Sequence, residues 1–215
     1  MQSLDQFARG KLKERDALKL RRAIVETDAG DGVRVVRNGR TLISFCSNDY
    51  LNLSQHPAVK RAAAQAAEQY GAGAGASRLV TGSHPLYRTL EARLAQLKGS
   101  EAACVFGSGY LANTGIIPAL TGPGDLILLD ELSHACIHAG AKLSESEVRL
   151  FRHNDTDHLQ SLLERERKQF RHALVVTEGI FSMDGDLAPL PDLRLAIDGL
   201  ATCALLAATE VLLED

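Results

Sequence analysis

The 215-residue sequence contains no tryptophan, and aromatic residues make up only 5% of it. It also lacks a long hydrophobic run, because its longest weakly polar stretch near the end, 199–206, is far shorter than the roughly 20 apolar residues that span a bilayer. The first thirty residues mix charges with isolated apolar positions, which is not typical of a secretory signal. These absences favour a cytoplasmic protein with no membrane partner.

The sequence has no large excess of charge of either sign. Its formal net charge is −3, with acidic and basic residues interspersed, so it lacks the basic stripe that attracts nucleic acid. The sequence has four cysteines, Cys46, Cys104, Cys136 and Cys203. They form no CxxC pair, and their spacing with the seven histidines is not that of metal ligands. We therefore expect no nucleic-acid partner, no metal site, and buried, reduced thiols.

The order of apolar and turn residues predicts an α/β protein with a largely parallel central sheet, because helical and strand-like segments alternate after residue 100. Hydrophobic residues account for 45% of the chain, which suffices for a sizeable core. We expect helices at 3–25, 58–70, 85–98, 111–120, 135–143 and 156–170, and strands at 102–106, 125–129, 148–151 and 173–177. A hairpin is expected at 34–45, turning at Asn38 and Gly39.

A glycine-containing turn, Phe106 to Asn113, joins an expected strand to an expected helix. The first N–H groups of a helix have no partner within it, so this turn is suited to binding a phosphate. A tight strand–helix turn would also favour Gly107 and Gly109 without any ligand. From the residues alone, both interpretations stay open.

Three other segments carry polar groups after expected strands, where ligands bind in parallel α/β sheets. His134 follows the second strand of the alternation, and its flat ring suits stacking on a planar cofactor. It is equally compatible with a plain position beside a helix cap at Ser133. Thr177 to Asp186 and Ser47 to Leu51 suit either ligand binding or turn formation.

Taken in order, these segments resemble the α-oxoamine synthases, which condense an amino acid with an acyl thioester and release carbon dioxide. The resemblance covers about residues 40–191. It is carried by the following motifs: Ser47-Asn48-Asp49-Tyr50-Leu51, the glycines of 71–75, Gly107-Ser108-Gly109-Tyr110, Leu132-Ser133-His134-Ala135, His153-Asn154-Asp155, and Thr177-Glu178-Gly179-Ile180-Phe181-Ser182-Met183-Asp184-Gly185-Asp186. The resemblance implies an aspartate-aminotransferase-like domain of fold type I that uses pyridoxal 5'-phosphate.

Within the family, the segment Thr81 to Arg88 looks most like the member of biotin biosynthesis that joins L-alanine to a pimeloyl thioester. The implied substrates are therefore L-alanine and pimeloyl-CoA or a pimeloyl carrier protein, and the implied assembly is a homodimer. A relative that uses glycine, of the glycine C-acyltransferase type, is the alternative within the family.

The resemblance also implies roles for cofactor-binding residues. The backbone of Gly109 and Tyr110 would bind the cofactor phosphate, and His134 would stack on the pyridine ring. Ser182 and Glu178 would lie near the cofactor, with Ser182 the better candidate for a hydrogen bond to it.

A second set of residues would approach the substrate. By resemblance these are Asn48, His134 and one arginine near the N-terminus, either Arg21 or Arg22. No residue is assigned as catalytic, because the family uses a Schiff-base lysine late in its sequence and no lysine follows Lys168 here.

The similarity ends at about Leu193, before the family's Asp-x-Ala-His motif and its lysine. Neither Asp198 nor Asp215 has the neighbours expected of the carboxylate that pairs with the pyridine nitrogen. We therefore expect three regions: an N-terminal helix and hairpin at 1–38, a partial large cofactor-binding domain at 39–193, and a divergent tail at 194–215.

This break leaves three interpretations of the chain. It is a truncated or frameshifted, catalytically impaired synthase whose fold is incomplete at the C-terminus, a non-catalytic relative, or one half of a split enzyme. In the last case, the lysine comes from a separate polypeptide.

Overall fold

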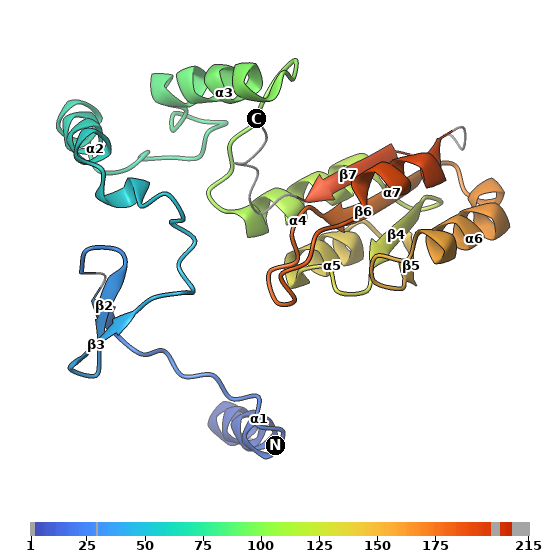
Figure 1. Ribbon diagram of the computed structural model, residues 1–215, viewed down its shortest axis with the longest axis horizontal. Helices are drawn as coiled ribbons and strands as arrows, with labels where there is room; N and C mark the ends of the chain where they lie inside the picture. The colour runs from blue at the N-terminus through green and yellow to red at the C-terminus, as the bar shows by residue number, and fades with distance from the viewer. Residues whose placement is uncertain (1–2, 29, 199–202, 208–215) are drawn as a thin grey trace. The chain divides into compact units, whose positions relative to one another are not determined.

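The computed structural model describes residues 3–28, 30–198 and 203–207, the last five by their backbone alone (Figure 1). The chain divides into two compact units, Met1–His84 and Pro85–Asp215. The boundary between these units falls between the glycine-rich segment and the third expected helix. Each unit is described by itself below.

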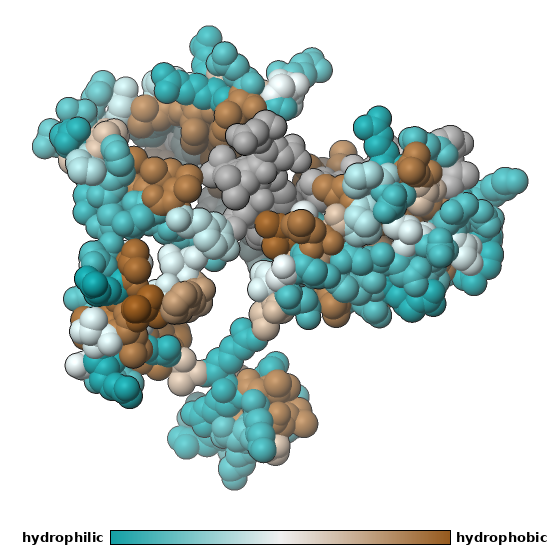
Figure 2. Space-filling model, in the orientation of Figure 1, coloured by the Kyte–Doolittle hydropathy of each residue, from teal (hydrophilic) through white to brown (hydrophobic). Residues whose placement is uncertain are grey.

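The first unit begins with helix α1, Leu4–Ala17. A capping box starts the helix, because the Ser3 hydroxyl accepts a hydrogen bond from Gln6 N–H and the Gln6 side chain accepts one from Ser3 N–H. The expected helix at 3–25 is thus too long, since the left-handed conformation of Lys19, with φ of 56°, ends it. The apolar side chains of α1 gather on one side of the helix (Figure 2), and none of them is buried.

A small antiparallel sheet follows, with strands β1 (Thr27–Asp28), β2 (Arg34–Arg37) and β3 (Arg40–Ile43) in that order. The expected hairpin is confirmed, because Asn38 and Gly39 both have positive φ, 52° and 72°, as a two-residue type I′ turn requires. The short helix η1 (Leu53–Gln55) and helix α2 (Pro57–Tyr70) complete the regular elements of this unit.

The second unit contains helices α3 (Pro85–Lys98), α4 (Gly109–Leu120), α5 (Ala135–Leu143), α6 (Thr156–Glu166), η2 (Arg167–Gln169) and α7 (Leu190–Ile197). Its strands are β4 (Leu126–Asp130), β5 (Glu147–Phe151), β6 (Ala173–Glu178) and β7 (Cys203–Ala207). All strand pairs are parallel, in the order β5-β4-β6-β7, which confirms the expected parallel α/β architecture (Figure 1).

The sheet is covered on both faces because the side chains of β4 and β6 are apolar in both directions. Leu126 and Leu128 of β4 pack with α6 and α7 residues on one face. Ile127 and Leu129 pack with residues of α4 and α5 on the other. All four are fully buried. At about 1.5–3 kcal/mol for each buried side chain, this continuous apolar strand anchors the unit.

Several expectations about this unit were wrong. The segment 102–106 is not a strand in the structure, and Phe106 is 43% exposed, so the apolar run there lacks the packing that strand formation needs. Helix α6 ends at Glu166 and gives way to η2 instead of continuing to residue 170. The sequence analysis did not predict α7 or β7.

The cysteines also differ from expectation. Cys46 and Cys104 are exposed, whereas Cys136 is buried as expected. The side chain of Cys203 lies outside the described residues. Over the described part of the chain, no helix has both the length and the apolar composition needed to cross a membrane.

Candidate functional site

The glycine-containing turn leads directly into α4. Ser108 is the N-cap, with φ of −165° and ψ of 158°, and its hydroxyl accepts a hydrogen bond from Leu111 N–H. Within the described part of the chain, the N–H groups of Gly109 and Tyr110 have no partner. A Cβ added to Gly109 would meet no atom within 4 Å, so the chain itself does not require glycine there. The turn therefore offers two free N–H donors at a helix N-terminus, the arrangement that binds anions.

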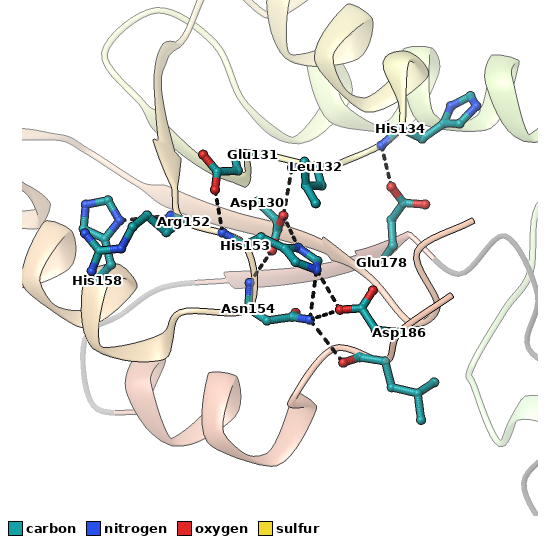
Figure 3. Close-up of polar contacts among 11 residues, drawn as sticks. Asp130, Glu131, Leu132, His134, Arg152, His153, Asn154, His158, Glu178 and Asp186 are labelled. Atoms are coloured by element: carbon teal, nitrogen blue, oxygen red, sulfur yellow. Dashed lines mark hydrogen bonds and ion pairs between the residues drawn. The ribbon is translucent and has the colours of Figure 1, made fainter. Parts of the chain in front are cut away.

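His134 lies at the start of α5, directly beyond the carboxyl end of β4. Its backbone N–H donates a short hydrogen bond to Glu178 Oε1 at the end of the neighbouring strand β6. Glu178 is 2% exposed, while the His134 side chain is exposed. Figure 3 shows the His134 ring directed away from the Glu178 carboxylate. Glu178 therefore fixes the backbone of His134 and leaves its ring open to a ligand.

The helix cap is His134 itself, and the interpretation of Ser133 as the cap is wrong. His134 Nδ1 accepts a hydrogen bond from Cys136 N–H at 3.2 Å. Nδ1 also lies 2.9 Å from Cys136 Sγ, which accepts a hydrogen bond from Asn113 Nδ2 at 3.2 Å. Side chains from α4 and α5 thus hold one edge of the imidazole ring.

Two buried hydroxyls adjoin this pair without a hydrogen-bond partner in the described residues. They belong to Ser133 and Thr177, which directly precede His134 and Glu178 and are 7% and 6% exposed. A buried hydroxyl without a partner is costly, so this end of the sheet has unused hydrogen-bonding capacity.

Ser182 lies in a turn of residues 179–188, between β6 and α7. Phe181 N–H donates to the Asp186 carbonyl at 3.0 Å, and Gly185 N–H donates to the Phe181 carbonyl at 2.7 Å. Gly185 has a φ of 77°, which glycine adopts without strain. The turn interpretation therefore holds for this segment, and Ser182 is exposed at its tip with no hydrogen bond to the described residues.

A polar cluster that the sequence analysis did not assign lies beside this turn (Figure 3). His153, after β5, has Nδ1 at 2.9 Å from Asp130 Oδ1 and Nε2 at 2.8 Å from Asp186 Oδ2. Asn154 donates from its backbone N–H to Asp130 Oδ2 at 2.9 Å and from Nδ2 to Asp186 Oδ2 at 2.9 Å. The motif His153-Asn154-Asp155 was the available signal, but nothing local connects it to Asp186, 33 residues away.

Contacts within this cluster shift the pKa values of His153 and Asp186. Burial favours the neutral form of His153, but hydrogen bonds to Asp130 and Asp186 outweigh it and raise the pKa of the imidazole above its usual 6.5. The hydrogen bond from His153 in turn lowers the pKa of Asp186. The cluster is therefore a paired ionic network at the carboxyl ends of β4 and β5.

The residues predicted to approach the substrate lie in the first unit. Asn48 is exposed and makes no hydrogen bond to described residues, while its neighbours Ser47 and Asp49 form turn hydrogen bonds. Arg21 forms an exposed ion pair with Asp16 at 2.9 Å, and Arg22 is exposed. Because the two units are described separately, the substrate-binding roles of Asn48, Arg21 and Arg22 stay predictions.

The geometry defines a class of protein, a three-layer α/β domain. At the carboxyl edge of its parallel sheet lie a helix N-terminus with unpartnered N–H groups, that of α4, and the exposed imidazole of His134. The family model described as aminotransferase class I and II matches residues 40–202. The chain therefore belongs to this family.

Curated relatives agree with this assignment. The chain is 61% identical over 193 residues to 8-amino-7-oxononanoate synthase of Beijerinckia indica, covering 90% of this chain and 50% of that protein. It is 64% identical over 190 residues to a putative 8-amino-7-oxononanoate synthase of Caulobacter vibrioides, covering 88% and 50%. The chain thus spans about half the length of the curated relatives it matches.

A solved structure shares the fold. Serine palmitoyltransferase of S. paucimobilis, with a bound PLP–myriocin aldimine, superposes with a TM-score of 0.85 at 29% identity. The alignment covers 96% of this chain and 52% of that one. The resemblance of this fold to pyridoxal-phosphate enzymes is thereby confirmed.

Proposed function

We propose that the chain forms the phosphate- and ring-binding part of a pyridoxal 5'-phosphate-dependent 8-amino-7-oxononanoate synthase. This enzyme would condense L-alanine with a pimeloyl thioester and release carbon dioxide, in biotin biosynthesis. The observation that carries the proposal is the pair of unpartnered N–H groups of Gly109 and Tyr110 at the N-terminus of α4, which packs against the helix that His134 caps. The sequence identity of 61–64% to proteins of that name supports the choice of reaction.

Each proposed role follows from a group already placed. The N–H groups of Gly109 and Tyr110 would donate to the cofactor phosphate, aided by the positive end of the α4 dipole. The exposed His134 ring would stack on the cofactor ring, while Glu178 holds its backbone in place. Ser182, exposed at the tip of its turn, would donate to the cofactor. The unpaired hydroxyls of Ser133 and Thr177 belong to the residues directly before His134 and Glu178.

When bound, pyridoxal phosphate supplies an electron sink for negative charge that develops on the amino-acid α-carbon. The residues of this chain would bind and orient that group and shield one of its faces. Asn48 and either Arg21 or Arg22 would contact the substrates, L-alanine and pimeloyl-CoA or a pimeloyl carrier protein. The proposed assembly is a homodimer, and the proposed location is the cytoplasm.

The sequence has no lysine after Lys168, and the relatives extend to about twice the length. We therefore assign no catalytic residue and propose that the Schiff-base lysine lies in the part of the relatives that this chain does not span. A second candidate is a pyridoxal-phosphate-binding subunit without activity of its own, or one half of a split enzyme. A glycine-using member of the family is the alternative reaction.

A binding and complementation experiment tests these proposals. Purified chain titrated with pyridoxal phosphate should bind it reversibly, and borohydride reduction followed by peptide mapping should find no single preferred lysine. Adding a polypeptide that contains the lysine-bearing half of a relative should restore L-alanine-dependent release of carbon dioxide with a pimeloyl thioester. Binding without restored activity would support the non-catalytic candidate, and no binding would contradict the proposal.

Replacing L-alanine by glycine in the restored reaction separates the two family reactions. Faster turnover with L-alanine is expected. Faster turnover with glycine would favour the glycine C-acyltransferase type.

A further inference from the structure

We propose that His153 is a positioning residue whose imidazole, held between Asp130 and Asp186, fixes the 179–188 turn and with it Ser182 at the carboxyl edge of the sheet. The part concerning Ser182 rests on the proposed function. The part concerning the turn rests on contacts alone.

The contacts require both ring nitrogens of His153 to act at once. Nδ1 lies 2.9 Å from Asp130 Oδ1, and Nε2 lies 2.8 Å from Asp186 Oδ2. An ionised carboxylate only accepts hydrogen bonds, and both imidazole nitrogens donate only in the protonated ring. With both carboxylates ionised, His153 bridges them as an imidazolium, in charge-assisted hydrogen bonds.

The two carboxylates differ in burial, so one side of the bridge is fixed and the other is not. Asp130 ends β4 and is fully buried, so it is a fixed point of the sheet. The Asp186 side chain is 44% exposed and belongs to the turn. The bridge therefore attaches a solvent-facing turn to a rigid strand.

Neighbouring groups reinforce the same attachment. Asn154 has a left-handed backbone, with φ of 54°, and its Nδ2 donates to Asp186 Oδ2 and to the Leu187 carbonyl at 3.3 Å. The Phe181 ring, 2% exposed, meets the His153 ring edge-on at 4.4 Å between centroids. Both ends of the turn are therefore tied to the segment that carries His153.

The hydrogen bonds inside the turn do not attach it to the sheet. Those of Phe181 and Gly185 join residues within 179–188 and set only its shape. Its placement depends on the buried side chains of Phe181 and Ala188 and on the His153–Asn154 contacts. Loss of the bridge should leave the shape of the turn intact but release Ser182 from a fixed position.

The charged groups around the ring are mainly acidic. Besides Asp130 and Asp186, the carboxylate of Glu131 accepts the backbone N–H of His153 at 3.0 Å. Arg152 on the same segment is paired with Asp155 at 2.7 Å, and His158 Nδ1 accepts Arg152 N–H. These surroundings stabilise the protonated ring, so deprotonation at higher pH should weaken the attachment.

Hydrogen exchange of His153→Gln tests the attachment in the full chain. The amides of 179–188 should exchange roughly tenfold faster or more, with those of β4 and β6 unchanged, because charge-assisted contacts to the turn are lost. His138→Gln, which removes an imidazole of α5 that makes no hydrogen bond to the described residues, is the control and should leave 179–188 unaffected. Unchanged exchange in His153→Gln, or equal acceleration throughout the unit, would overturn the proposal.

The pH profile supplies a readout that a purely structural packing role would not move. After correction for intrinsic exchange, protection of 179–188 should fall as pH rises above about 6.5 in the unaltered chain. It should be flat with pH in His153→Gln. A flat profile in both would contradict the ionic bridge.

A double-mutant cycle tests the link to Ser182. His153→Gln should weaken binding of pyridoxal phosphate several-fold, and this effect should vanish in a Ser182→Ala background. Additive effects would overturn the positioning of Ser182. If the unaltered chain does not bind pyridoxal phosphate, the proposed function fails, and the exchange and pH results alone decide the proposal.

Discussion

At the scale of single residues, Cys136 links two helices through its thiol. Its Sγ accepts from Asn113 Nδ2 and lies 2.9 Å from His134 Nδ1, which also accepts the Cys136 backbone N–H. The uncharged His134 ring should therefore carry its hydrogen on Nε2. This places a donor on the far side of the ring from the helix.

Replacing Cys136 tests this arrangement. Cys136→Ala should lose the side-chain contacts at both ends, lower the free energy of unfolding by about 1 kcal/mol and loosen the His134 ring. Cys136→Ser should retain them. Imidazole ¹⁵N chemical shifts of His134 measure the tautomer, and Cys104→Ala, at an exposed thiol, is the control. An identical His134 signal in Cys136→Ala would contradict the contact.

The ion pair of Asp125 with Arg171 predicts a pH dependence of stability. Asp125 is 1% exposed and accepts hydrogen bonds from Arg171 Nε at 3.0 Å and Nη2 at 2.8 Å. The Arg171 hydrogen bond, despite burial, holds the pKa of Asp125 down to about 2. Because the folded pKa lies below the unfolded value, this stabilisation is present above about pH 4 and lost as pH falls towards 2.

Asp125→Asn should therefore lower the free energy of unfolding at pH 7 by roughly 1–3 kcal/mol and flatten the decline between pH 4 and 2. Urea denaturation across this pH range measures both effects. Glu101→Gln, at an exposed loop position, should reproduce the unaltered profile. An unflattened decline in Asp125→Asn would show that other carboxylates cause it.

The sequence predicted the positions of two candidate site residues, although their roles stay proposals. Gly109 and His134 follow or precede elements in a fixed pattern, so their place at the sheet edge could be inferred. The bridge of His153 to Asp186 could not, because it joins segments 33 residues apart through a tertiary contact. The cap of α5 was misassigned because Ser133 and His134 are both able to cap a helix, and only the backbone geometry selects one.

At the scale of elements, the close approach of α4 and α5 depends on Gly140. A Cβ there would lie 2.5 Å from the Asn113 carbonyl oxygen and 3.0 Å from the Ile117 Cδ1. Both helices begin at the candidate site, with Gly109 and His134 at their N-termini. Their packing thus sets the distance between the proposed phosphate and ring contacts.

Gly140→Ala should lower the free energy of unfolding by roughly 1–3 kcal/mol, because the backbone of α4 must move away. Gly10→Ala in α1 is the matched control, since its Cβ would meet nothing within 4 Å, and alanine favours a helix by about 1 kcal/mol. Thermal unfolding of the two variants measures the change in stability that each substitution causes. Equal effects of the two substitutions would contradict the tight helix contact.

Helices and strands with strong periodicity were predicted close to their observed bounds, as β6 and α5 show. The segment 102–106 was not, because apolar composition alone does not supply a neighbouring strand. Strand β7 was not predicted, because an alanine- and leucine-rich sequence is also compatible with a helix. Only its pairing with β6, a tertiary contact, identifies it as a strand.

At the scale of the whole molecule, the candidate groups divide between the two units. Gly109, His134 and Ser182 lie in the second, whereas Asn48 and the two arginines lie in the first. The chain spans about half of its curated relatives and has no lysine after Lys168. Cofactor binding and turnover are therefore separable claims, and binding is the one that the described residues address.

The most direct measurement is the preference of the chain for pyridoxal 5'-phosphate over pyridoxal, compared with that of Gly109→Pro. Proline at the first position of α4 removes one N–H donor yet suits a helix start, and the extended Ser108 is compatible with a following proline. The account predicts tighter binding of the phosphorylated compound and a roughly tenfold loss of that preference in Gly109→Pro. Gly109→Ala, which keeps the N–H, should retain more of it. An equal preference in the unaltered chain and Gly109→Pro would contradict the assignment of the phosphate site.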